Sequence, residues 1–169
     1  MMKVIFLSLL VLTLVSFDGL QVNETDEKVA VSRMLDAWHK AAAEANFNTY
    51  FGMMTEDAIF IGTDPTENWD LKDFKAYAKP HFDKGKAWNF KAIERHIYFD
   101  KSGKLAWFDE LLNTQMKICR GSGVVVKIGK EWKIKHYVLS MTIPNDNVDE
   151  VVKVIVPLED KLLQKTLSK

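Results

Sequence analysis

The second half of the chain holds two long runs in which apolar and polar residues alternate, 115–128 and 131–143. They flank a glycine-containing turn, which is typical of a β-hairpin. Side chains of one parity form one face of a strand, and the apolar ones predict the face that meets the core: Val124, Val126, Ile128, Trp132, Ile134 and Val138. The same parity places Arg120 and His136 on that face. Because a cation and an imidazole on an apolar face need partners or a ligand, we expect both to face a cavity.

Helical spacing prevails in the first half of the chain. Apolar residues recur every three to four positions over residues 26–46, which predicts a long amphipathic helix. Thr25 is a suitable cap for this helix, and His39 lies at the border of its apolar stripe. A short second helix over residues 46–55 and a short strand over residues 58–61 follow.

Two further helical segments contain a proline. Asp70 is a suitable cap for a third helix that ends at Gly85, after a polar and aromatic loop over residues 63–69. Pro80 lies inside this helix, so we expect a kink or break just before it. A terminal helix follows the hairpin, and we expect Pro157 to break it and leave a short amphipathic tail.

The strands are consecutive along the chain. Runs over residues 91–99 and 105–112 precede the hairpin, and the short turns between runs predict an antiparallel meander. Helices followed by strands indicate an α+β fold, with the helices packed on one face of a curved antiparallel sheet. A sheet rolled over a long helix forms a cone, and we expect a pocket at its open end.

Composition narrows the functional classes. The chain has 169 residues with equal numbers of basic and acidic side chains, 23 of each. It is long enough for one domain with a core, and it lacks the positive charge that is typical of proteins that bind nucleic acid. We therefore expect no nucleic-acid partner.

The N-terminal residues resemble a signal peptide. Lys3 precedes an apolar run over residues 4–17, which is shorter than the roughly 20 residues that span a bilayer. We predict an exported protein, periplasmic or secreted, without a stable membrane span after processing; an uncleaved anchor is the alternative. The predicted organisation is a signal peptide (1–19), a linker (20–27), one domain (28–155) and a C-terminal tail (156–169).

Motifs for cofactors and metals are not found in the sequence. Cys119 is the single cysteine, so no internal disulfide is expected, and its parity places it opposite Arg120. The four histidines lie on separate predicted elements without the spacing of metal ligands. There is no phosphate-binding loop and no nucleotide fingerprint. We expect neither a metal nor a cofactor.

Several motifs are spread over about residues 26–155: Phe60-Ile61-Gly62-Thr63-Asp64, Trp69, residues 77–82, Glu94-Arg95-His96, residues 106–110, residues 120–123, Trp132-Lys133-Ile134 and Ile143-Pro144-Asn145. Together they resemble the SnoaL-like branch of the nuclear transport factor 2-like superfamily. The resemblance implies a cone-shaped α+β fold, commonly dimeric, with a pocket between the helices and the sheet. It implies no single activity, because the superfamily contains isomerases, cyclases, dehydratases and hydrolases alongside binding and scaffolding members.

Two consecutive carboxylates are the candidate catalytic groups. Asp109 and Glu110 lie in one predicted strand, so one points inward and the other outward. An inward carboxylate in a dry pocket could act as a general base, as it does in isomerase members of the superfamily, with His136 assisting. The alternative is a structural ion pair with Arg120 or Arg95.

The remaining candidates are ligand-binding residues. Trp69, Tyr77, His81 and Trp88 are expected to rim the open end, where aromatic rings suit a flat or apolar ligand. Arg120 and Arg95 could hold an acidic group. The leading hypothesis is an exported small-molecule-binding protein. The alternatives are a cofactor-free isomerase, cyclase or hydrolase, and a homodimeric interaction module that uses the outer face of the sheet.

Overall fold

The computed structural model describes residues 23–168, so the predicted signal peptide lies outside the described residues. Helix α1 (Glu24–Ala43) is followed by the short helix α2 (Phe47–Gly52). The side chain of Asn23 accepts a hydrogen bond from Thr25 N and caps α1. The helix therefore begins before the predicted position, and residues 24–27 of the predicted linker are helical.

The sheet has six strands in the order β2-β1-β6-β5-β4-β3. They are β1 (Met54–Ile61), β2 (Asn68–Asp70), β3 (Lys91–Phe99), β4 (Leu105–Thr114), β5 (Lys117–Ile128) and β6 (Glu131–Met141). The predicted antiparallel meander is confirmed as β3 to β6. Strand β1 joins it parallel to β6. Strand β2 occupies the end of the segment that was predicted as a loop, and pairs with β1.

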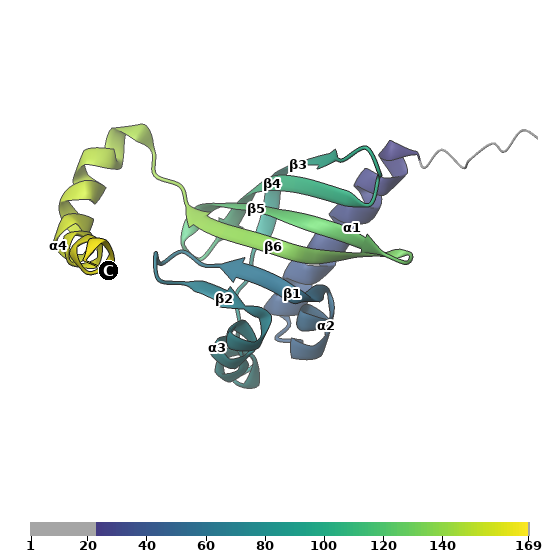
Figure 1. Ribbon diagram of the computed structural model, residues 1–169, viewed down its shortest axis with the longest axis horizontal. Helices are drawn as coiled ribbons and strands as arrows, with labels where there is room; N and C mark the ends of the chain where they lie inside the picture. The colour runs from purple at the N-terminus through teal and green to yellow at the C-terminus, as the bar shows by residue number, and fades with distance from the viewer. Residues whose placement is uncertain (1–22, 169) are drawn as a thin grey trace, which may run out of the picture.

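The helices and the sheet form two layers, which confirms the predicted α+β class. Figure 1 shows α1 crossing behind the curved sheet, with α2 and α3 (Leu71–Asp83) at one end. The core lies between these helices and the inner face of the sheet. Its largest fully buried side chains include Trp38, Tyr50, Phe74 and Tyr137. The opposite, outer face of the sheet is not covered by any helix among residues 23–168 (Figure 1).

A β-bulge in the hairpin overturns the predicted parity. Val124 pairs with His136, whereas Val125 pairs with Ile134, so Lys135 is an extra residue in β6. Inward positions therefore change parity within this strand. Trp132 and Ile134 point inward before the bulge, and Tyr137 and Leu139 point inward after it.

The parity predicted for β5 was also wrong. The buried residues of this strand are Cys119, Gly121, Gly123 and Val125, while the alternate residues are partly or fully exposed. Glycines lie on the inner face because rings from the neighbouring strands fill the space above them. A Cβ atom on Gly121 would lie 2.1 Å from Tyr137 Oη, and one on Gly123 would lie 2.9 Å from the Phe108 ring. The inner face of β5 therefore carries Cys119, the two glycines and Val125, while Val124, Val126 and Ile128 lie on the outer face.

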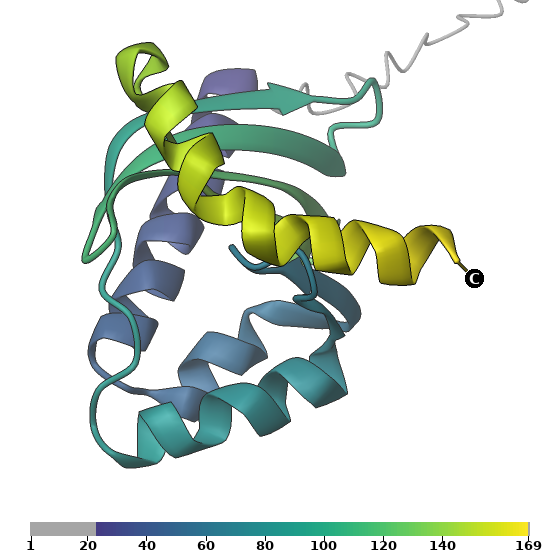
Figure 2. The ribbon, with the colours of Figure 1, turned by 90° about the vertical axis from the view of Figure 1, so that its left-hand side faces the viewer.

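Neither internal proline ends its helix. Helix α3 continues through Pro80, where both this residue and Ala76, four positions earlier, are exposed. The carbonyl that a proline leaves unpaired can therefore meet water. After the short η1 turn (Asn145–Asn147), α4 (Val148–Leu167) continues through Pro157. The predicted break is wrong, although Figure 2 shows α4 bending part-way along its length.

Helix α4 lies apart from the two-layer body (Figure 1). None of its residues is buried. A hollow of about 550 Å³ lies between α4 and the β1–β2 loop, lined by Ile155, Leu158 and Leu162 from the helix. Within residues 23–168, no helix combines the length and apolar character needed to cross a bilayer.

Candidate functional site

Glu110 is the inward member of the pair of carboxylates on β4. Phe108, Glu110 and Leu112 are buried on the inner face of the strand, and Asp109 lies between them on the outer face. The Glu110 side chain is fully enclosed, with 0% of its surface exposed, whereas 45% of the Asp109 side chain is exposed. Asp109 instead contacts His96 on the outer face, with its carboxylate 3.1 Å from Nδ1.

Three side chains close around the Glu110 carboxylate. His39 Nε2 lies 2.8 Å from Oε1, and Tyr137 Oη donates to the same oxygen at 3.1 Å. Arg95 Nε donates to Oε2 at 2.8 Å, and Arg95 Nη2 lies 2.7 Å from it. Because a carboxylate only accepts hydrogen bonds, His39 is the donor through Nε2–H. Both carboxylate oxygens are therefore occupied by groups of the protein itself.

Arg95 ties this cluster to the long helix. Its Nη1 donates to the carbonyl oxygen of Ser32 at 3.0 Å and to Ser32 Oγ at 2.8 Å, and it lies 2.9 Å from Asp36 Oδ1. His39 belongs to the same helix, α1, so β3 and β4 are both joined to α1 through Glu110. The predicted structural ion pair therefore exists, and Arg95 is its cationic member. Arg95 does not contact the cavity described below.

The electrostatics of the cluster keep Glu110 ionised. Burial pushes the pKa of Glu110 upward, but the hydrogen bond from His39 and the positive charge of Arg95 outweigh burial and hold it below its ordinary value. Burial raises the pKa of Tyr137 well above its ordinary value, so its hydroxyl stays protonated and donates to Glu110. An enclosed carboxylate with a lowered pKa is poorly suited to general-base catalysis.

Arg120 and His136 do not face the interior. Arg120 is exposed on β5, and His136 is partly exposed on β6, both on the outer face of the sheet. The prediction that they face a cavity is wrong, because the glycines of β5 are on the inner side and the bulge at Lys135 changes the parity of β6. Neither residue lies near Glu110 on the same face, so His136 is not placed to assist it.

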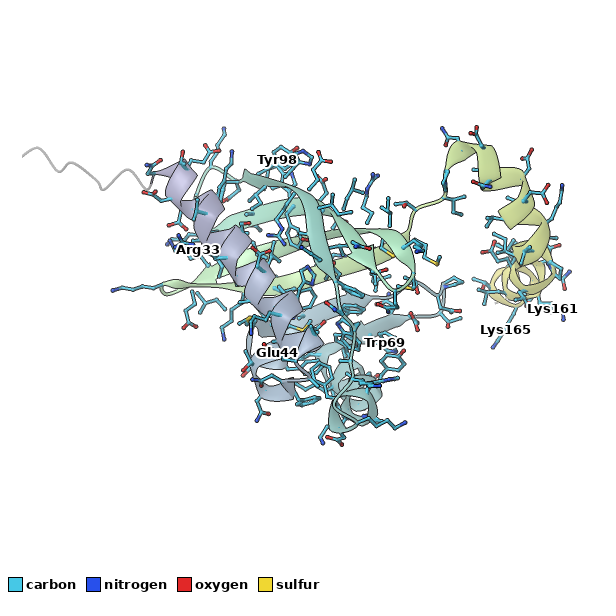
Figure 3. All side chains as sticks on the ribbon, turned by 180° about the vertical axis from the view of Figure 1, so that it is seen from behind. Arg33, Glu44, Trp69, Tyr98, Lys161 and Lys165 are labelled. Atoms are coloured by element: carbon cyan, nitrogen blue, oxygen red, sulfur yellow. The ribbon has the colours of Figure 1, made fainter. Side chains whose placement is uncertain are left out.

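A cavity of about 170 Å³ opens between α3, β1, β2 and the β4–β5 turn. Three of the predicted rim residues line it: Trp69, Tyr77 and Trp88. Figure 3 shows Trp69 beside α3. His81, the fourth, is exposed on α3 and contacts Tyr77 with the ring centroids 5.4 Å apart, but it is not among the lining residues. The rest of the lining comprises Phe60, Gly62, Thr63, Glu67, Phe74, Phe90, Gln115, Met116 and Leu139.

The aromatic side chains of this cavity form an ordered wall of nearly parallel rings. Trp69 stacks on Tyr77 with centroids 4.5 Å apart and planes inclined by 24°. Phe74 lies nearly parallel to Trp69, at 8°, and to Trp88, at 20°. Phe74 also stacks on Phe60 at a centroid distance of 4.0 Å. Rings that pack on one another in this way are held in place before any ligand arrives.

Most residues of these sites were not predicted from the sequence, among them His39, Tyr137, Glu67 and Phe74. His39 was placed at a helix border, yet only 3% of it is exposed and it contacts Glu110. Tyr137 was hidden by the bulge, and Glu67 and Phe74 were treated as loop and packing residues. The sequence did contain a signal for Tyr137: Gly121 and Gly123 on the preceding strand indicate that a bulky side chain packs closely against that strand.

Comparisons with known proteins agree with this architecture. Residues 31–144 match the model of the SnoaL-like domain family. A search of curated proteins finds no match.

Among solved structures, a nuclear transport factor 2-like protein of unknown function from Pseudomonas putida superposes with a TM-score of 0.60 and 11% identity, covering 74% of this chain and 92% of that one. A protein from Novosphingobium aromaticivorans proposed to be a scytalone dehydratase superposes with a TM-score of 0.59 and 16% identity. The match covers 70% of this chain and 89% of that one. These similarities show the fold. The chain therefore belongs to the SnoaL-like domain family, and it has the fold of the nuclear transport factor 2-like protein.

Proposed function

We propose that this protein binds a small, flat or apolar molecule in the aromatic cavity. The observation that carries the proposal is the wall of Trp69, Tyr77 and Trp88, three rings that line one concave site. Ligand sites are typically concave and apolar with a few polar groups, and Thr63 and Gln115 supply such groups here. At about 170 Å³ the cavity suits a compact ligand.

Enzymatic use of Glu110 is a weaker alternative. Members of this fold include a protein proposed to be a dehydratase, and such chemistry needs an accessible acid or base. The Glu110 side chain is fully enclosed and already bonded to His39, Arg95 and Tyr137. A substrate would have to displace one of these partners before it could reach the carboxylate.

The predicted signal peptide remains part of the proposal. If residues 1–19 direct export, the ligand is met in the periplasm or outside the cell. The ligand-binding body begins after this segment, because α1 starts at Glu24.

Loss of the aromatic wall tests the binding proposal. A library of compact fragments is screened by thermal shift, since a ligand that binds only the folded state raises the unfolding temperature. Fragments that bind the wild type are expected to bind Trp69→Ala at least about fivefold more weakly, because a stacked indole face contributes on the order of 1 kcal/mol. The matched control is Arg120→Ala on the outer face, which is expected to bind as the wild type does. Binding lost in Arg120→Ala but kept in Trp69→Ala would contradict the proposal, and so would a screen without any binder.

We also propose that the outer face of the sheet pairs with a second copy of the chain. Apolar side chains are exposed on it: Ile93, Tyr98, Leu105, Trp107, Ile118 and Ile128. Tyr98 and Trp107 stack with centroids 5.9 Å apart, which presents a rigid aromatic patch. Large exposed apolar side chains on one face are typical of interaction sites.

Light scattering coupled to gel filtration tests the pairing. The wild type is expected to show twice the mass of one chain, and Trp107→Lys is expected to shift toward the monomer, because a charge would be buried at the centre of the interface. Val29→Lys, at an exposed apolar position on α1, is the control and is expected to remain dimeric. A monomeric wild type at concentrations of tens of micromolar would contradict this part of the proposal.

A further inference from the structure

The charge of the cavity indicates which ligands it can take. Glu67 is the single charged residue among the side chains that line it, and lysine, arginine and histidine are missing from the lining formed by the described residues. The faces of aromatic rings are also electronegative, so they attract cations. The carboxylate and the ring faces therefore both attract a cationic ligand and both repel an anionic one.

Glu67 is held in place at the cavity by the β1–β2 loop. Its carbonyl oxygen accepts a hydrogen bond from Gly62 N at 3.0 Å, and its own N–H donates to Asp64 O at 2.9 Å. Its Oε2 accepts a bond from Asp64 N at 3.2 Å. These three bonds fix both the backbone and one carboxylate oxygen, so the charge is preorganised and not a mobile surface group.

Gly62 provides the room for this carboxylate. A Cβ atom on Gly62 would lie 2.0 Å from Glu67 Oε2 and 2.9 Å from its carboxyl carbon. A side chain at this position would therefore push the carboxylate away from the end of β1. Gly62 also lines the cavity, as do Phe60 and Trp69 on the paired strands β1 and β2. The close approach at Gly62 thus places a negative charge beside the aromatic wall.

We propose that the cavity selects small organic cations, that is, a protonated amine or a quaternary ammonium group on a compact apolar frame. The inference rests on the proposed function and specifies its ligand class. The cationic head would lie between the Glu67 carboxylate and the ring faces, and the apolar frame would contact the wall. Binding of a cation against rings and a carboxylate in a partly closed site contributes more than the same contacts in open water.

Three probes of nearly one shape test the charge preference. Choline carries a positive charge, dimethylbutanol is its uncharged carbon isostere, and dimethylbutanoate carries a negative charge. Titrations followed by tryptophan fluorescence are expected to show choline binding about tenfold more tightly than dimethylbutanol, with dimethylbutanoate weakest. The preference for choline is expected to shrink as salt is raised, because ions screen exposed charges.

The variant Glu67→Gln separates charge from shape. It keeps an oxygen that can accept the bond from Asp64 N, and it is expected to reduce the choline preference to about twofold or less while dimethylbutanol binds as before. Glu56→Gln, an exposed carboxylate on β1 that does not line the cavity, is the control and is expected to keep the full preference.

Equal or tighter binding of dimethylbutanol by the wild type would overturn the cation inference and leave the binding function intact. A choline preference that survives in Glu67→Gln would overturn the assigned role of Glu67. If none of the three probes binds, the inference also fails, and the fragment screen then decides separately whether the cavity binds any ligand.

Discussion

Replacing Glu110 with alanine is expected to lower the free energy of unfolding by about 3–5 kcal/mol, the largest effect of any single change considered for this protein. The substitution leaves Arg95 and His39 beside a vacated, enclosed space, and Arg95 loses its buried anionic partner. It also removes the bond between His39 of α1 and β4, while Arg95 of β3 keeps its bonds to Ser32 on α1. Urea denaturation followed by circular dichroism measures the change.

Asp109→Ala is the matched control for this experiment. Asp109 is the neighbouring carboxylate on the same strand, but it is 45% exposed and contacts only His96 and solvent on the outer face. Its loss is expected to cost less than about 1 kcal/mol. Similar destabilisation by both substitutions would show that the buried cluster does not carry the stability assigned to it.

The effect of Glu110 is expected to depend on pH in a defined direction. Because the pKa of Glu110 in the folded protein lies below its ordinary value of 4.5, ionised Glu110 stabilises the fold above that value. This contribution is lost as the pH falls through the lowered pKa. The stability difference between the wild type and Glu110→Gln should therefore be larger at about pH 7 than at about pH 3. A difference that is independent of pH would show that the charge of Glu110 is not stabilising.

Gly123→Ala is expected to destabilise the protein by about 3 kcal/mol, at the upper end of the usual cost of overpacking. The new Cβ would lie 2.4 Å from the carbonyl oxygen of His136 and 2.9 Å from the Phe108 ring. The ring can move, but the carbonyl belongs to the backbone of β6 beside its bulge, so the two strands must separate. The shift in the denaturation midpoint reports this cost.

Gly52→Ala provides the comparison for that variant. No atom lies within 4 Å of a Cβ built on Gly52, which ends helix α2. Alanine is expected to leave the stability unchanged or to raise it by up to about 1 kcal/mol, because it restricts the unfolded chain. If Gly123→Ala were as well tolerated as Gly52→Ala, the close approach of β5 and β6 would not require glycine.

Elements defined by local periodicity could be predicted from the sequence. In the long helix, the third helix and the meander, apolar residues keep one regular spacing over many residues. These elements are found as α1, α3 and β3 to β6. Strand β2 escaped prediction because it has three residues and exists through its pairing with β1. Pairing between distant segments leaves no periodic signal in so short a stretch.

The orientation of the second half of β6 could not be predicted because one extra residue changes it. Lys135 is the extra residue in β6, and it forms an ion pair with Asp57 on the neighbouring strand β1. The bulge is defined by the pairing of β6 with β5, and the partner of Lys135 in the ion pair lies about eighty residues away along the chain. A one-residue shift moves every later side chain of β6 to the other face, which is why His136 was assigned inward. Arg120 was assigned inward for another reason: Val124, Val126 and Ile128 share its parity on β5 and were taken as the core face, whereas the buried face of β5 carries its glycines.

The aromatic part of the site was predictable for a different reason. Trp69, Tyr77 and Trp88 all belong to the segment that links β1 to the meander, so any fold that closes one end of the cone brings them together. The choice between Asp109 and Glu110 was not predictable, because each is accompanied on its face by an aromatic residue, Trp107 or Phe108. Arg95 lies opposite Glu110 on the inner face and forms the ion pair with it, so Glu110 is the buried carboxylate. This pairing depends on the register of β3 and β4.

The location of a bound ligand tests the binding proposal most directly. A crystal structure of the protein soaked with a fragment that binds in solution is expected to show the fragment between Trp69, Tyr77 and Trp88, beside Glu67, with the bonds of Glu110 to His39 and Arg95 intact. A fragment found in contact with Glu110 in place of His39 or Arg95, or seated on the outer face at Arg120 and His136, would contradict it.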